Sequence, residues 1–463
     1  MAFATINPYT GQTVKTFPEA TPADIDAAIG RAHAAFLTWR DVSLEDRAKV
    51  LKRAAELLRA EPRKFAQILT LEMGKLIGEA EAEVELCAKI LDYYVQHGAQ
   101  GLAPRYLPAE GFGDTDVQLV KQPLGVLFAV EPWNFPYYQV IRISAPQVTA
   151  GNAIVLKHAA NVPQSALAME QLFRDAGAPE GLLTNLFVSH EDAERVIADP
   201  RVRGVALTGS ERAGSSVAAL AGKYMKKSTL ELGGADAFIV LSDADVAQAA
   251  KWAVFGRHWN AGQVCVSSKR IIVEDAVYDE FLKHYRQGVS ALKAGDPLDP
   301  ATTLAPLSSQ GARDGLAKQV EEAIAHGAKA ETLGQPVPTQ GAFYQPTLLT
   351  DIASDNPAFH TEFFGPVSQV YRVANEDEAI KLANDSPYGL GGSVFSQDTA
   401  RAKRVAARME TGMVYINQPT GVKADIPFGG VKNSGYGHEL IDLGLNEFVN
   451  EKVVVVSDIN GAF

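Results

Sequence analysis

The sequence predicts an α/β protein built on doubly wound parallel sheets. From Gly151 onward, short apolar runs alternate with segments of helical periodicity, as is typical of parallel strands joined by helices. Before residue 100, apolar side chains recur every three or four positions, which predicts a helical layer. The chain has 463 residues, enough for two or three domains with separate cores.

Four helices are predicted in the N-terminal region. The first begins at Thr21-Pro22, where a hydroxyl cap precedes proline at the first helical position. The second follows Ser43, and the third begins near Pro62. The fourth runs over about 76–96 and places four apolar side chains on one stripe: Val84, Cys87, Leu91 and Val95. Cys87 is therefore expected to pack in a core.

The period changes near Val117. The runs 117–122 and 125–130 are of β type, and the turn between them is typical of a hairpin or of the entry to a sheet. Further strands are expected at 153–157, near 186–187, at 202–208 and at 228–232, with helices from Pro163, near Glu191 and from Ser210. A second series contains a strand at 237–241, a helix ending at His258, a strand at 270–274, a helix to about 293 and a strand at 414–417.

Polar residues follow several of these strands. Ligand sites of doubly wound sheets lie beyond the carboxyl ends of the strands, and Lys157, 208–210 and 231–234 occupy such ends. A domain boundary is predicted near Gly233-Gly234. The final β-type run, 452–456, pairs either with a partner subunit or with an edge strand of its own chain.

Composition excludes several classes of function. The net charge is -12 with dispersed Lys and Arg, so the electrostatic footprint of a nucleic-acid-binding protein is missing. No apolar run is long enough for a membrane span, and the N-terminus does not have the pattern of a signal peptide. Two cysteines favour a reducing compartment, and the cytoplasm is the expected location. The nine histidines include no HExxH, and we expect no metal.

Cys265 is the candidate nucleophile. It follows a turn of small residues, Asn260-Ala261-Gly262, in which Gly262 lets the backbone come close to a ligand. A lone cysteine is also often a small buried hydrophobe, and this loop alone leaves both interpretations open.

Three other features could carry chemistry. The segment 209–214 opens a helix after an apolar strand and could face a phosphate, although it matches neither the Walker nor the GxGxxG pattern. Asn134 stands in a rigid PWNFP turn that suits an oxyanion donor and equally suits a packed aromatic turn. Glu231, at a strand end, could act as a general base or simply be solvated.

Seven segments together carry a family resemblance. They are PWNFP at 132–136, LK at 156–157, TGS at 208–210 with Gly214, LELGG at 230–234, GQVC at 262–265, EFFGPV at 362–367 and PFGG at 427–430. In this order they make the chain resemble the aldehyde dehydrogenase superfamily over essentially its full length. The wider pattern, including LKHAANVP at 156–163 and IRISAP at 141–146, is most similar to the succinate-semialdehyde branch.

The resemblance implies a catalytic set. Cys265 would attack the aldehyde carbonyl as a thiolate, Asn134 with the Cys265 backbone N–H would hold the oxyanion, and Glu231 would activate the water that hydrolyses a thioester. Cysteine suits this chemistry because part of it is thiolate near neutral pH and sulfur leaves readily at deacylation. The implied reaction is NAD(P)-dependent oxidation of succinate semialdehyde to succinate.

The resemblance also implies a cofactor site. Its contacts would be Trp133, Lys157, Thr208, Gly209, Ser210, Gly214, Leu232, Glu362 and Phe364. Where many NAD-preferring members have Glu, this chain has Ala160, and His158 replaces a common proline. A carboxylate at Ala160 would repel a 2′-phosphate, so its absence beside Lys157 predicts that NADP is preferred and that NAD is accepted.

Substrate residues are predicted with an alternative. In succinate-semialdehyde dehydrogenases an arginine at the position of Arg142 faces the substrate carboxylate, which a guanidinium binds bidentately; Arg142 could instead belong to an internal ion pair. Tyr138, Trp259 and Phe428 are candidate tunnel walls or core aromatics. Ser267 stands where some relatives have a second cysteine, which excludes a disulfide within this loop.

The resemblance implies a dinucleotide-binding domain (residues 1–105 and 124–233), a catalytic domain (234–448) and an oligomerisation element (106–123 and 449–463) of a homodimer or homotetramer. Two rival functions remain. The enzyme could oxidise another small or aromatic aldehyde, or the chain could be a non-catalytic dinucleotide-binding or structural protein.

Overall fold

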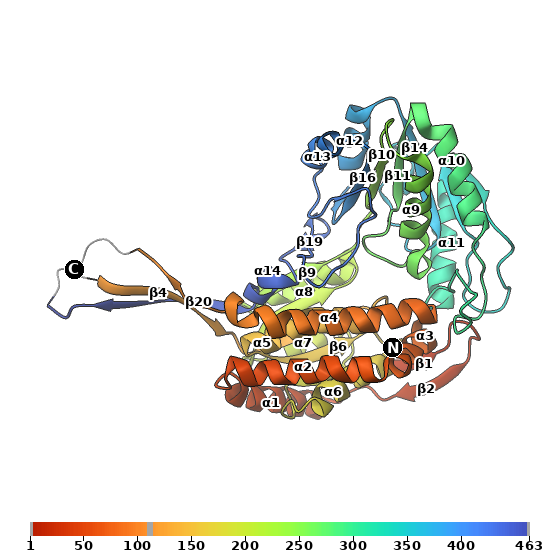
Figure 1. Ribbon diagram of the computed structural model, residues 1–463. Coiled ribbons are helices and arrows are strands. Elements are labelled where there is room, and N and C mark those ends of the chain that lie inside the picture. Colours follow the sequence, from red (N-terminus) through yellow and green to blue (C-terminus); the bar gives the residue numbers. More distant parts are fainter. Residues whose placement is uncertain (1–2, 109–113, 461–463) are drawn as a thin grey trace.

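The computed structural model describes residues 3–108 and 114–460. Two lobes, each built around a mainly parallel sheet, lie side by side, and an arm of β-strands extends away from the first lobe (Figure 1). Helices cover the sheets of both lobes. The predicted α/β class with doubly wound parallel sheets is confirmed.

The first sheet has six strands in the order β19-β9-β8-β5-β6-β7, parallel except for the edge strand β19. Its strands are β5 (Val126–Glu131), β6 (Ala153–His158), β7 (Leu183–Asn185), β8 (Val202–Thr208), β9 (Lys227–Glu231) and β19 (Gly435–Tyr436). Beside them lie α1 (Pro22–Trp39), α2 (Leu44–Ala60), α3 (Pro62–Met73), α4 (Ile77–Gly101), α5 (Pro136–Ala150), α6 (Pro163–Asp175), α7 (Ala193–Ala198), α8 (Glu211–Lys223) and α14 (Ile441–Asn446). The strand order reverses between β5 and β8, so a binding crevice is expected beyond Glu131 and Thr208.

The second sheet has seven strands in the order β12-β13-β14-β11-β10-β16-β17, parallel except for β12. They are β10 (Ala237–Val240), β11 (Arg270–Glu274), β12 (Lys329–Thr332), β13 (Thr347–Thr350), β14 (Val367–Val373), β16 (Gly392–Phe395) and β17 (Tyr415–Ile416). The helices of this lobe are α9 (Val246–His258), α10 (Asp275–Ser290), α11 (Gln310–Ala325), α12 (Glu376–Asn384) and α13 (Thr399–Ala406), with 3-10 turns η1 (Trp259–Gly262) and η2 (Pro357–His360). Two small sheets pair β1 (Phe3–Ile6) with β2 (Thr13–Phe17) and β15 (Tyr388–Gly389) with β18 (Val431–Lys432).

The arm is an antiparallel sheet in the order β20-β4-β3. Its strands are β3 (Arg105–Tyr106), β4 (Asp114–Pro123) and β20 (Val449–Ser457). The final strand thus pairs within its own chain, which is one of the two predicted alternatives, and it forms an edge of the arm. Val453 is 55% exposed and Val455 is 47% exposed. Residues 109–113 and 461–463 of the predicted oligomerisation element lie outside the described residues.

The N-terminal helices begin where the sequence predicts. Thr21 caps α1 with a reciprocal pair of hydrogen bonds to Asp24, and Ser43 caps α2. Helix α4 continues to Gly101, beyond the expected end, and Tyr94 in its second half donates a hydrogen bond to the Ile441 carbonyl at 3.0 Å. Tertiary contacts of this kind extend a helix past its local signals. Cys87 is fully buried in the core of the first lobe, as predicted.

The structure decides one open alternative and shifts two elements. Of the two arrangements predicted for the turn at 123–125, a hairpin or the entry to a sheet, the structure has the second, because β5 lies between β6 and β8 while β4 belongs to the arm. The strand expected near 186–187 is β7, a few residues earlier, and α7 begins at Ala193. The stretch 435–448, which the predicted catalytic segment 234–448 contains, contributes β19 to the first sheet and Leu440, Leu445 and Phe448 to its core. The domain boundaries themselves stay a prediction.

Candidate active site

The Cys265 loop is held in an unusual backbone conformation. Asn260, Ala261 and Gly262 all have positive φ, at 51°, 54° and 76°. A Cβ on Gly262 would lie 2.4 Å from the Gly365 carbonyl oxygen. A side chain at this position would therefore collide with the segment at Gly365, which explains the need for glycine here.

Buried polar contacts fix the same loop from behind. Arg257 is fully buried and donates to the Val367 carbonyl at 2.7 Å and to the Phe363 carbonyl at 2.6 Å. It also donates to Ser267 Oγ, which in turn donates to the Gly256 carbonyl at 2.7 Å. The hydroxyl at the position of the missing second cysteine thus has a structural role that a thiol, a weak hydrogen-bonding group, would serve poorly.

The thiol opens into a cavity of about 260 Å³ at the predicted crevice. Its lining combines the segments after β5, β8 and β9 with residues of the second lobe: Pro132, Trp133, Asn134, Gln139, Thr208, Gly209, Ser210, Leu232, Gly233, Cys265, Glu362 and Phe364. Burial raises the pKa of the Cys265 thiol to about 11, while Lys269 and Arg142 act to lower it. The resting group is therefore a neutral thiol, and attack requires its deprotonation.

Asn134 is held with its amide toward the cysteine loop. Its Nδ2 donates to the Gln263 carbonyl at 3.1 Å, and the amide of Gln139 lies 2.8 Å from its Oδ1. The Asn134 carbonyl accepts from buried Lys75 at 2.9 Å and from Asn260 Nδ2 at 3.0 Å. A donor fixed in this way before charge develops meets the requirement for oxyanion stabilisation.

Glu231 belongs to a buried cluster of three carboxyl groups. Strand register sets it beside Thr208, and Glu131 and Glu439 complete the cluster around Arg142. Burial raises the pKa of Glu231 well above its ordinary value, Arg142 opposes this, and the other carboxylates add to it. Among the described residues its two oxygens have no hydrogen-bond partner. In its carboxylate form such a group has a high proton affinity and can accept a proton from water.

Arg142 is already partnered. It is 1% exposed, forms an ion pair with Glu439, and donates to Thr208 Oγ1 at 2.8 Å and to the Tyr138 hydroxyl at 3.3 Å. Its guanidinium also lies over the rings of Tyr138 and Phe428, 5.0 and 4.7 Å from their centroids. This is the internal ion pair that the sequence left open beside a substrate contact.

The candidate tunnel walls are buried or half-buried aromatics. Trp259 packs edge-on against Phe135 at 5.1 Å between ring centroids, and Tyr138 and Phe428 are nearly fully buried. All three, like Arg142, lie outside the lining of the Cys265 cavity. Their assignment to the substrate stays a prediction.

The cofactor residues fall around two cavities. Seven line the Cys265 cavity: Trp133, Thr208, Gly209, Ser210, Leu232, Glu362 and Phe364. Lys157 lines a second cavity of about 250 Å³ beside α8, together with His190 and Arg212. Gly214 lies on α8 where a Cβ would come within 2.6 Å of Leu232, and the Ala160 carbonyl accepts from the Ala4 N–H at 3.0 Å.

The arrangement fits a dinucleotide. The two cavities flank the N-terminal half of α8, whose Ser210 cap leaves the positive end of the helix dipole toward the crevice. Lys157 supplies a cation at one end, and Glu362 lies beside Cys265 at the other. Among the described residues, no group of His, Cys, Asp and Glu could hold a metal ion.

Sequence reasoning missed two residues of this site, Lys269 and Glu439. Lys269 donates to the Cys265 carbonyl and pairs with Glu362, and Glu439 pairs with Arg142. His158 is buried and its pKa is lowered to about 4 by burial; it accepts from the Ala159 N–H at Nδ1 and therefore donates from Nε2 to the Pro136 carbonyl. The signal for Lys269 was its place four residues after Cys265, and Glu439 lies shortly after the PFGG motif.

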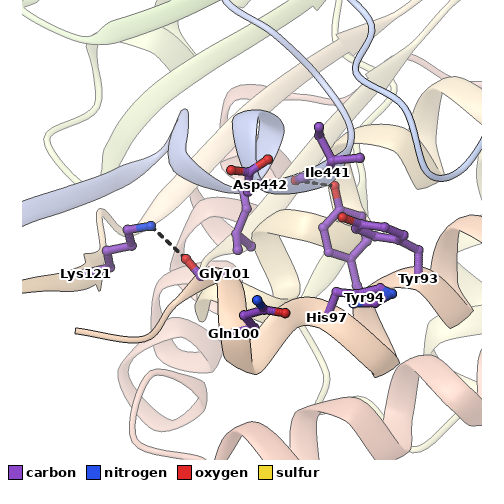
Figure 2. Close-up of a pocket in the computed structure, with 9 residues that line it drawn as sticks. Tyr93, Tyr94, His97, Gln100, Gly101, Lys121, Ile441 and Asp442 are labelled. Atoms are coloured by element: carbon purple, nitrogen blue, oxygen red, sulfur yellow. Dashed lines mark hydrogen bonds between the residues drawn. The ribbon is translucent and has the colours of Figure 1, made fainter. Parts of the chain in front are cut away.

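A further cavity, of about 320 Å³, lies at the foot of the arm between α4 and α14 (Figure 2). Tyr94 donates to the Ile441 carbonyl on one wall, and Lys121 donates to the Gly101 carbonyl at 2.7 Å on another. Its lining shares no residue with the Cys265 cavity, so it is separate from the candidate active site.

The chain belongs to the aldehyde dehydrogenase family, whose model matches residues 1–454. It is 53% identical over 452 residues to a succinate-semialdehyde dehydrogenase [NADP(+)] of Deinococcus radiodurans, covering 98% of this chain and 94% of the relative. Its identity to the enzyme of the same name from Mycobacterium avium is 46% over 455 residues, 98% of this chain and 96% of that one. The solved succinic semialdehyde dehydrogenase of Streptococcus pyogenes in complex with NADP+ superposes with a TM-score of 0.96 at 47% identity, over 99% of this chain and 100% of the other.

These findings confirm the resemblance to the superfamily and make the chain an aldehyde-oxidising enzyme by family. The rival class of a non-enzymatic protein loses its support, since the family model and the enzymes to which the chain is similar match it over nearly its full length. None of the described helices is long and apolar enough to cross a membrane.

Proposed function

We propose that this enzyme oxidises succinate semialdehyde to succinate, prefers NADP and accepts NAD. The observation that carries the proposal is the single cavity that brings Cys265, Asn134 and Glu362 together at the strand reversal of the first sheet. The relatives of this chain that carry the succinate-semialdehyde name, at 44–53% identity, support the choice of substrate.

Cys265 starts the reaction. Its sulfur, once deprotonated, forms a bond to the aldehyde carbon, and the carbonyl oxygen becomes an oxyanion that Asn134 Nδ2 and the Cys265 N–H stabilise. The chemistry supplied by the bound nicotinamide is hydride acceptance, which turns this hemithioacetal into a thioester. Glu231 then takes a proton from water as the water oxygen bonds to the acyl carbon, and the carbon–sulfur bond breaks to return the thiolate.

The preference for NADP rests on the cavity around Lys157. Lys157, Arg212 and His190 face this cavity, and no carboxylate side chain is part of its lining. A 2′-phosphate would gain charge-assisted contacts there, and Ala160 supplies no carboxylate to oppose it. NADP should give the higher kcat/KM.

We include in the proposal that Arg142 binds the substrate carboxylate. Because the guanidinium is paired with Glu439, it must share its charge with the substrate or exchange partners when the substrate enters. The ion pair is also the observation that favours the second candidate, oxidation of an uncharged small or aromatic aldehyde.

The test is a panel of succinate semialdehyde, butanal and benzaldehyde, each assayed with NADP and NAD. The proposal expects the highest kcat/KM for succinate semialdehyde with NADP and loss of cofactor reduction in Cys265→Ala. Equal kcat/KM for butanal would overturn the choice of substrate without affecting the family assignment.

The assembly completes the proposal. The arm, with its edge strand β20 and exposed valines, would pair with another subunit to form a homodimer or homotetramer.

The domain division at 233–234 is retained, with residues 1–105 and 124–233 binding the dinucleotide. The free thiol of Cys265 needs reducing conditions, which is why a cytoplasmic location is proposed.

A further inference from the structure

Lys269 is a buried cation with three specific partners. Its side chain is 1% exposed. The ammonium donates to the carbonyls of Val264 at 2.6 Å and Cys265 at 2.7 Å, and it pairs with Glu362 Oε1 at 3.1 Å. A lysine ammonium has three donors, so all three are used, which is the condition under which a lysine is stable in the interior.

Three segments distant in sequence meet at this ammonium. The Gly234 N–H donates to Glu362 Oε1 at 3.1 Å, and a Cβ on Gly234 would lie 2.6 Å from the Cys265 carbonyl oxygen. Lys269 Nζ also lies 5.6 Å from the centroid of the Phe364 ring. The nucleophile loop, the end of β9 and the Glu362 segment are therefore joined through one side chain.

We propose that Lys269 is a positioning residue of the reaction, which locks the Cys265 loop to Glu362 and supplies a positive charge that favours the thiolate. The inference rests on the proposed function in one respect, namely that Glu362 contacts the cofactor. Through this lock, the group that orients the cofactor and the group that attacks the aldehyde keep one fixed separation.

The charges around the thiol show why Lys269 matters for reactivity. Burial raises the pKa of Cys265 most, Lys269 and Arg142 lower it, and Asp236 and Glu362 raise it further. Arg142 is already neutralised by Glu439. Removing the ammonium would leave the Glu362 carboxylate without this partner and would take away the cation that lowers the pKa of the thiol, so the thiolate would become harder to form.

The experiment measures alkylation of Cys265 by iodoacetamide as a function of pH in the intact enzyme, with peptide mapping to separate it from the buried Cys87. In Lys269→Met the midpoint should rise by about one pH unit, so that alkylation at pH 8 falls about tenfold. Lys269→Arg keeps the positive charge, so its alkylation midpoint should equal that of the wild type. Glu362→Gln should move the midpoint the other way, because a carboxylate that raises the pKa is removed.

Lys226→Met is the matched control, since Lys226 also donates to two backbone carbonyls, those of Asp199 and Val202, but lies in the first lobe and outside the lining of the Cys265 cavity. It should leave the midpoint unchanged. NADP binding, measured by fluorescence titration, should weaken at least about tenfold in Lys269→Met, because Glu362 loses its partner.

An unchanged alkylation midpoint and unchanged NADP affinity in Lys269→Met would overturn the inference. If that variant does not fold, a Glu362→Gln midpoint equal to that of the wild type would overturn it instead. Alkylation requires no aldehyde, so a failure of the proposed substrate would leave this result standing, and the two failures are distinguishable.

Discussion

Replacing Arg142 by Met tests what holds the carboxylate cluster together. The change removes the partner of Glu439, which is 4% exposed, and leaves its carboxyl group buried near Glu131 and Glu231. Breaking one side of a buried ion pair costs about 3–5 kcal/mol of unfolding free energy, because the remaining charge is uncompensated. Removing both partners, in Arg142→Met with Glu439→Met, should recover most of that loss.

The loss should depend on pH with a definite sign. Burial raises the pKa of Glu439 and Arg142 acts against this, so without the arginine its folded-state pKa lies further above the unfolded value. A group whose pKa is raised on folding contributes stability below its unfolded pKa and loses it as the pH rises through the folded pKa. Arg142→Met should therefore be closest to the wild type near pH 5 and most destabilised at pH 8.

Thermal and urea denaturation at these two pH values provide the measurement. A single variant as stable as the wild type at pH 8 would refute the reasoning that the pair is structural. The double variant also separates stability from substrate recognition. If Arg142 binds the substrate carboxylate, the ratio of kcat/KM for succinate semialdehyde to that for butanal should fall about tenfold or more in this variant.

Three further predictions concern cofactor, base and assembly. Ala160→Glu should shift the preference from NADP toward NAD, since a carboxylate repels the 2′-phosphate; an unchanged kcat/KM ratio would mean that the ribose site lies elsewhere. Glu231→Gln should allow one rapid burst of cofactor reduction, after which turnover should be slower than in the wild type by about 10²–10⁴-fold. The thioester should then be detectable by mass spectrometry. In the wild type, deacylation should become faster as the pH rises through the raised pKa of Glu231. Val453→Asp with Val455→Asp should reduce the molar mass in light scattering, and an unchanged mass would show that β20 is not the subunit contact.

Local signals in the sequence were sufficient for the elements and for the order of the motifs. Thr21 and Ser43 predicted their helix starts because a hydroxyl cap acts on the residues just beside it. The strand ends at Thr208 and Glu231 predicted the crevice because carboxyl ends of parallel strands meet at one edge. The path of β4 and the return of 435–448 to the first lobe were not predictable in this way, since both depend on partners hundreds of residues away.

The charges of the site are the part that sequence reasoning could not place. A Lys, Glu or Arg is ordinarily expected at the surface. When it is buried it must have a partner, because an isolated ion is unstable in the interior. Lys269 and Glu439 each stand in sequence beside a recognised motif, yet nothing local indicates that one pairs with Glu362 and the other with Arg142. Once those partners are known, the ion pair that the sequence left open for Arg142 is present, and the arginine shares its charge with Glu439. Any substrate carboxylate must then compete with Glu439, so selectivity for an anionic aldehyde depends on the balance of charge in the whole cluster rather than on one arginine.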